Sequence, residues 1–137
     1  RYVHGTDEVN LLPNLRRHLD AHGFANVRID PPPGGNDGRF PASRTDLRHP
    51  WAAWMKSAVE RGSNRPCGVL PNSGGSNMTH IIQFVLDAPI TWLPLSYAGC
   101  SQHAPNEHIL MPLMREGMRH VTGIYWDLGD PATGYRR

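Results

Sequence analysis

The sequence has few of the residues that redox and metal motifs, or nucleic-acid binding, usually require. Its 137 residues include two cysteines, Cys67 and Cys100, too far apart in sequence to form a CxxC motif. Two buried thiols in a reducing compartment are the simplest interpretation. All but one of the fourteen basic residues are arginines, and they are scattered along a chain with a net charge of only +2. This distribution argues against a nucleic-acid partner.

Long hydrophobic runs are also missing. The most apolar stretch, residues 81–95, is interrupted by Asp87, Pro89 and Pro94 and is too short to cross a bilayer. The chain begins at Arg1 without the basic, apolar and small-residue regions of a signal peptide, and we expect a processed or truncated product. The sequence therefore predicts a cytoplasmic protein without a membrane partner.

Alternating strand and helix patterns predict an α/β fold with a layered sheet. Residues 1–5 and 24–30 read as strands on either side of a helix over 6–23, which gives a β-α-β unit. Four leucines at helical spacing predict a buried face on this helix: Leu11, Leu12, Leu15 and Leu19. Residues 31–46 are rich in proline and glycine and predict a linker. The pattern beyond it predicts helices over 50–62, 76–86 and 105–129 and strands over 67–71 and 90–96.

His103 precedes the last predicted helix, on a short polar loop in GCSQHAPNEHILMPLMREG. A neutral imidazole at this position is suited to binding a metal ion, and Glu107, four residues on, would hold the loop or orient the ring. One histidine does not make a zinc site, which takes three or four protein ligands. From spacing alone, His103 is therefore either a metal ligand or an exposed loop histidine. His80, His108 and His120 fall within predicted helices and are interpreted as ordinary helical histidines.

A second candidate site is the segment PNSGGSNMTH. Gly74 and Gly75 let backbone amides approach a ligand closely, and the helix start at Ser76 and Asn77 favours an anion such as a substrate carboxylate. A turn that only caps the helix explains the same residues.

Taken together, GCSQHAPNEHILMPLMREGM, LPNSGGSNMTHIIQ and GIYWDLG resemble the C-terminal part of the dinuclear-zinc amidohydrolases and peptidases. This family includes acetylornithine deacetylase, succinyl-diaminopimelate desuccinylase, aminoacylase and the glutamate carboxypeptidases. The resemblance implies that His103 is the last ligand of a zinc pair, for which cobalt or manganese can substitute. It also implies that Gly74, Gly75, Ser76 and Asn77 face the substrate, a small amide or dipeptide.

The same resemblance implies two regions. Residues 1–30 are similar to the last β-α-β piece of a lid or dimerisation domain, and residues 31–137 to the C-terminal part of a zinc-exopeptidase-like catalytic domain. The complete enzyme would be a homodimer.

The other metal ligands of this family, a His-x-Asp pair, a bridging Asp and a Glu-Glu pair that includes the general base, have no counterpart here. The letters HLD at 18–20 lie within a predicted helix and are interpreted as a chance match. We therefore expect the C-terminal portion of a hydrolase of N-acyl amino acids or small peptides, inactive as this fragment alone. The alternative is a non-catalytic association module that pairs through the edge of the N-terminal β-α-β sheet.

Overall fold

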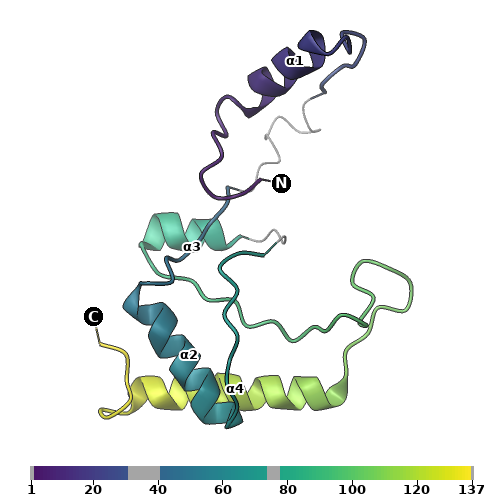
Figure 1. Cartoon of the computed structure of the whole chain (residues 1–137). Coiled ribbons are helices and arrows are strands. Elements are labelled where there is room, and N and C mark those ends of the chain that lie inside the picture. Colours follow the sequence, from purple (N-terminus) through teal and green to yellow (C-terminus); the bar gives the residue numbers. More distant parts are fainter. Residues whose placement is uncertain (1, 31–40, 74–77, 137) are drawn as a thin grey trace. The chain divides into compact units, whose positions relative to one another are not determined.

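The structure, a computed structural model, describes residues 2–30, 41–73 and 78–136. Its secondary structure in these ranges consists of four helices (Figure 1): α1 (Leu11–Ala21), α2 (Pro50–Ser63), α3 (Thr79–Leu86) and α4 (Met111–Gly129). No residue in these ranges belongs to a strand. The predicted α/β layered sheet is therefore wrong, and the sheet edge proposed for association is not formed by the described residues.

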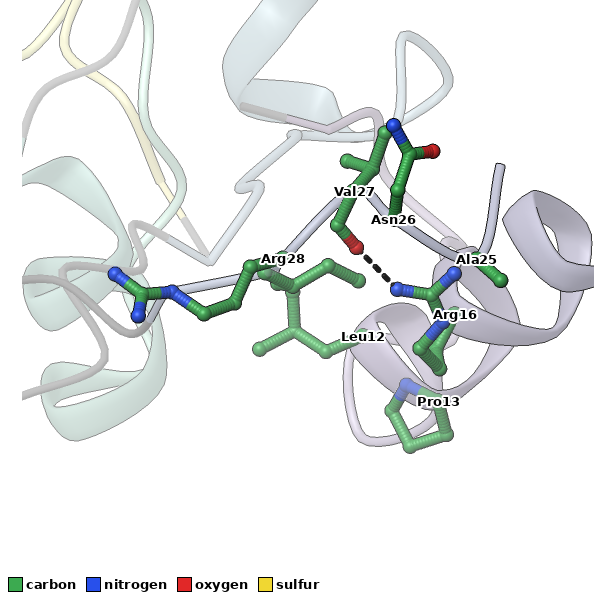
Figure 2. Close-up of a pocket in the computed structure, with 8 residues that line it drawn as sticks. Leu12, Pro13, Arg16, Ala25, Asn26, Val27 and Arg28 are labelled. Atoms are coloured by element: carbon green, nitrogen blue, oxygen red, sulfur yellow. Dashed lines mark hydrogen bonds between the residues drawn. The ribbon is translucent and has the colours of Figure 1, made fainter.

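The predicted strands are irregular because a strand needs a neighbouring strand to take its backbone hydrogen bonds. Residues 24–30 lie beside α1, but a side chain takes the place of a partner strand. The Arg16 guanidinium donates to the carbonyls of Phe24, at 3.0 Å, and Val27. Figure 2 shows the hydrogen bond from Arg16 to the Val27 carbonyl. It lies beside a hollow of about 590 Å³ that is lined by α1 and residues 25–29.

The chain divides into two compact units, and each is described separately. Unit 1 is Arg1–Arg44 with Gly74–Ala88, and unit 2 is Thr45–Ser73 with Pro89–Arg137. The boundary predicted between residues 30 and 31 stays a prediction.

Helix α1 of unit 1 begins at Leu11, five residues later than expected. Pro13 explains the late start, since a proline has no N–H and is tolerated only in the first turn of a helix. The leucine face predicted as buried is only partly covered, because Leu12 is 46% and Leu15 is 42% exposed.

Helix α3 of unit 1 covers most of the predicted range 76–86. It is joined to the residues that precede unit 2 by a 2.9 Å hydrogen bond between the Ser43 and Thr79 hydroxyls. The side-chain amide of Gln83 also donates to the Arg44 carbonyl at 2.9 Å.

Unit 2 has its core at the crossing of α2 and α4. Met55, Ala58 and Val59 of α2 are buried there. Gly117 of α4 is buried against Leu95, whose Cδ2 lies 2.2 Å from the place where a Cβ on Gly117 would be. A side chain at position 117 would therefore force the Leu95 side chain to move.

Polar contacts fix the same crossing and the chain after it. Arg61 of α2 forms an ion pair of 2.7 Å with Asp127 of α4. Trp54 donates its indole N–H to the Thr133 carbonyl at 2.6 Å, and its ring lies edge-on to that of Tyr135. The chain after α4 is thereby held against α2.

Helix α2 confirms the predicted start at Pro50. The His49 ring accepts a hydrogen bond from the backbone N–H of Trp51 at 3.1 Å, and proline suits the first turn. The helix ends at Ser63, and the next residue, Asn64, is left-handed with φ of 53°.

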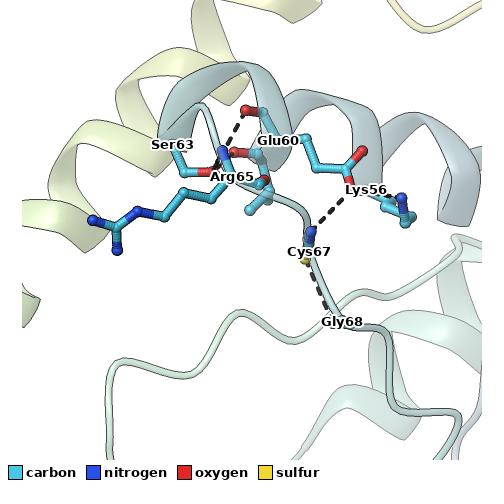
Figure 3. A network of polar contacts seen from close by, with 7 residues as sticks. Lys56, Glu60, Ser63, Arg65, Cys67 and Gly68 are labelled. Atoms are coloured by element: carbon cyan, nitrogen blue, oxygen red, sulfur yellow. Dashed lines mark hydrogen bonds and ion pairs between the residues drawn. The ribbon is translucent and has the colours of Figure 1, made fainter.

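A polar network follows this helix end (Figure 3). Glu60 accepts from the backbone N–H of Cys67 at 2.9 Å and pairs with Lys56 at 2.6 Å. The Cys67 hydrogen bond, followed by that from Lys56, lowers the pKa of the Glu60 carboxyl. Residues 67–71 are thus tied to α2 rather than to a sheet.

Helix α4 ends at Gly129 as predicted but begins at Met111 instead of Pro105. Pro112 accounts for the difference, because in a helix beginning at 105 it would fall in the interior, where its ring clashes with the preceding turn.

None of the four helices is long and apolar enough to span a membrane, as far as the described residues go.

Candidate functional site

The candidate site is the loop of residues 97–110, which contains His103 and leads into α4. Four backbone hydrogen bonds close it. The N–H of Cys100 donates to the Tyr97 carbonyl at 3.1 Å, and that of Ala104 to the Ser101 carbonyl at 2.9 Å. The N–H of Glu107 donates to the Ala104 carbonyl at 3.3 Å, and that of His108 to the Cys100 carbonyl at 3.1 Å. The last bond joins the two ends of the segment 100–108. The loop is therefore a closed structure and not a loose connection.

Three residues within this loop have left-handed backbone conformations: Ser101 with φ of 56°, His103 with φ of 60° and Asn106 with φ of 64°. Only two other non-glycine residues of the described chain are left-handed. The conformation costs an L-amino acid roughly 1–2 kcal/mol, and such residues cluster at functional sites. The strain is concentrated around His103.

Glu107 holds the backbone of the loop. Its carboxylate accepts a hydrogen bond of 3.3 Å from the backbone N–H of His103. Of the two roles predicted for Glu107, the structure shows the first, which is holding the loop.

The imidazole of His103 itself is exposed, and in the described part of the chain neither ring nitrogen forms a hydrogen bond. Both nitrogens are therefore accessible to a ligand from outside the loop.

A second histidine fixes the base of the loop. Nδ1 of His108 lies 2.9 Å from the Asn106 carbonyl, which can only accept, so this nitrogen carries the proton. Nε2 then accepts from the Tyr97 hydroxyl at 2.6 Å. The Tyr97 ring also lies against Gly99, where a Cβ would be 2.7 Å from Cε2. His108 is thus a positioning residue outside any helix, and its predicted place within α4 is wrong.

The sequence offered a weak signal for this network. Asparagine tolerates left-handed backbone, which suits Asn106, but the pairing of Tyr97 with His108 over eleven residues has no local pattern. The sequence interpretation therefore missed Tyr97 and His108.

The structure describes only some of the other candidates. Gly74, Gly75, Ser76 and Asn77 lie outside the described residues. Asp20 of the HLD segment pairs with Arg16 at 2.6 Å on α1. Over residues 2–30, 41–73 and 78–136, no three His, Cys, Asp or Glu side chains come together as a metal-binding group.

His120 differs from His103 in being largely covered. Its Nε2 is buried, has no hydrogen-bond partner in the described structure and lies 4.0 Å from Glu116. The ring packs at the crossing with α2, where His120 Cδ2 is 3.7 Å from a Cβ built on Gly62. This histidine is part of the core rather than a ligand.

Comparison with protein-family models, with curated proteins and with solved structures finds no match. The family remains a resemblance in the sequence.

Proposed function

We propose that this chain is the C-terminal portion of a metal-dependent hydrolase of amide or peptide bonds, and that His103 supplies one ligand to its zinc site. The substrates are N-acyl amino acids or small peptides. The observation that carries the proposal is the His103 loop, in which the imidazole is exposed while its backbone N–H is held by Glu107. This combination fits a histidine that supplies one ligand to a metal ion whose other ligands come from other residues.

The His103 loop fits a zinc ligand in chemistry as well as in position. A neutral imidazole is a common zinc ligand. Glu107 accepts from the backbone N–H of His103 and leaves the ring N–H to other partners, so it acts by fixing the loop. When bound, a zinc pair polarises the scissile carbonyl and activates water. The chain's own contribution is to fix the place of one imidazole, through Glu107 and through the Tyr97–His108 hydrogen bond.

Catalysis would need residues that this sequence lacks. The expected Glu-Glu pair has no counterpart, so the chain offers no candidate for the general base. We therefore propose that the remaining ligands and the base belong to sequence encoded before Arg1.

Two measurements test this proposal. The sequence encoded immediately upstream of Arg1 should contain a His-x-Asp pair and a Glu-Glu pair. The purified 137-residue chain with added zinc should not hydrolyse N-acetyl amino acids or dipeptides, whereas the upstream-extended polypeptide should. An upstream sequence without these acids and histidines would refute the hydrolase proposal, and turnover by the short chain would refute its dependence on upstream residues.

A further inference from the structure

Helix α4 has two faces of different character. One face meets α2 and Leu95 through Gly117, His120 and Asp127. The other face is exposed and forms a continuous stripe that we call the outer seam. Its members are Arg115, Met118, Arg119, Thr122, Tyr125, Trp126 and Gly129.

The outer seam has the spacing of a helix that pairs with another helix. Successive members are three, one, three, three, one and three residues apart, which repeats after seven residues as in coiled coils. Its central side chains are large and uncovered. Met118 is 59%, Tyr125 73% and Trp126 77% exposed. Large exposed apolar side chains grouped on one helix face and bordered by arginines are typical of an interaction surface.

A hollow lies in the middle of the outer seam. It has a volume of about 450 Å³ and is lined by Met118, Arg119, Thr122, Gly123 and Trp126. The last four stand at positions i, i+3, i+4 and i+7, the arrangement that receives one side chain of a facing helix. Gly123 leaves the hollow open, since a Cβ built on it meets no atom within 4 Å.

We propose that the outer seam binds the outer seam of a second copy of this chain, with the two α4 helices antiparallel and a two-fold axis near Thr122. In this register Arg119 faces the partner's Tyr125, and Met118 faces the partner's Trp126. Thr122 of each copy enters the hollow of the other. The same patch serves both copies, as a two-fold interface requires.

The charges on α4 favour a second copy of this chain as the partner and favour an antiparallel pair of helices. Parallel helices would place Arg115 and Arg119 against the same arginines of the partner, which repel. Antiparallel helices instead place the guanidinium of Arg119 over an aromatic ring, an attractive cation–π arrangement. They also bring Arg115 beside Asp130 and the negative end of the partner helix. The pattern is thus complementary to itself in one direction only.

The exposed aromatic side chains of the outer seam are the main source of contact area for this dimer. Covered aromatic side chains bury about 150–250 Å² each. Tyr125 and Trp126 of both copies would therefore supply a large part of the roughly 1,600 Å² of a standard interface. This surface lies in unit 2, apart from residues 1–30, where the sequence resemblance places dimerisation.

Sedimentation velocity over a range of protein concentrations tests the proposal. We expect a reversible dimer whose dissociation constant rises at least about tenfold in Trp126→Ala and in Arg119→Glu. Trp92→Ala is the matched control, because Trp92 is 63% exposed but lies outside α4, and it should leave the dimer unchanged. A strictly monomeric chain, or a dimer unaffected by both seam variants, would overturn the proposal.

Disulfide cross-linking tests the register in a Cys67→Ser background. Thr122→Cys should form a cross-linked dimer with itself under mild oxidation. Arg115→Cys should cross-link to Gly129→Cys in a mixture, and neither should cross-link to itself. Self-cross-linking of Arg115→Cys without any at Thr122→Cys would show another register and overturn the antiparallel arrangement. Circular dichroism checks that each variant keeps its helices, which we expect because the altered seam positions are exposed and Cys67 is only partly buried.

Discussion

At the scale of single residues, the His103 loop shows how hydrogen bonds within one loop can hold a histidine in place. Glu107 binds the backbone of His103, and Tyr97 binds His108 at the base of the loop. These contacts offset backbone strain at three non-glycine residues. Its place in this hydrogen-bonded loop distinguishes His103 from His4, which is equally exposed.

Removing the Tyr97 hydroxyl should loosen this loop. Tyr97→Phe leaves Nε2 of His108 without its donor, and we expect a loss of about 1 kcal/mol in the local opening free energy. Hydrogen exchange at the backbone N–H of His108 reports the change. Tyr125→Phe, at an exposed site on α4, is the control and should have no effect on that amide. Equal exchange in Tyr97→Phe and the native chain would contradict the positioning role.

The role of Glu107 could be predicted from the sequence, because a residue four positions away is close in any compact turn. The tautomer and partner of His108 could not be predicted, because they depend on a hydrogen bond between residues eleven apart. The substrate-binding role of Gly74, Gly75, Ser76 and Asn77 stays a prediction.

At the scale of the elements, proline decides where three helices begin. The starts of α1 and α4 follow from Pro13 and Pro112, and the start of α2 from Pro50. Local chemistry of this kind can be predicted from the sequence. Strands over 24–30 and 90–96 could not be judged in this way, since they form only when another strand supplies the ladder.

The turn that follows α4 has a steric requirement at Gly134. A Cβ there would lie 2.7 Å from the Asp130 carbonyl oxygen and 3.1 Å from that of Leu128. Backbone oxygens cannot rotate away, so we expect Gly134→Ala to destabilise unit 2 by about 1–2 kcal/mol in urea unfolding. Gly129→Ala meets no atom within 4 Å and is the control. A Gly134→Ala chain as stable as the control would show that the turn is not fixed.

The Glu60 network makes a prediction about pH. The pKa of Glu60 is lowered in the folded chain, first by the hydrogen bond from the N–H of Cys67 and then by that from Lys56. A carboxyl whose pKa is lowered by folding stabilises the fold at pH values above its ordinary pKa of 4.5. This stabilisation is lost as the pH falls through the pKa of the folded chain. Glu60→Gln should therefore unfold more easily than the native chain at pH 7, and the difference should shrink as the pH falls below 4.5. A difference in urea midpoint that stays constant or grows as the pH falls would contradict this assignment.

At the scale of the whole molecule, the described chain has more apolar side chains on its surface than its core accounts for. Only Met55, Ala58, Val59 and Cys100 are buried hydrophobic residues among those described. Several large side chains of α3, including Phe84, Val85 and Leu86, are at least 60% exposed. A helix that is apolar on all sides is normally buried in a larger protein. The exposed side chains of α3 are therefore a surface on which further polypeptide could pack.

Zinc content is the most direct test of the central claim that His103 is a metal ligand. It should be measured in the upstream-extended polypeptide, for the native sequence and for His103→Ala, with the exposed His4→Ala as the control. The account predicts about two zinc ions in the native polypeptide and the control, and about one in His103→Ala, since a site that loses one of its few ligands binds far more weakly. Two zinc ions retained in His103→Ala would contradict it.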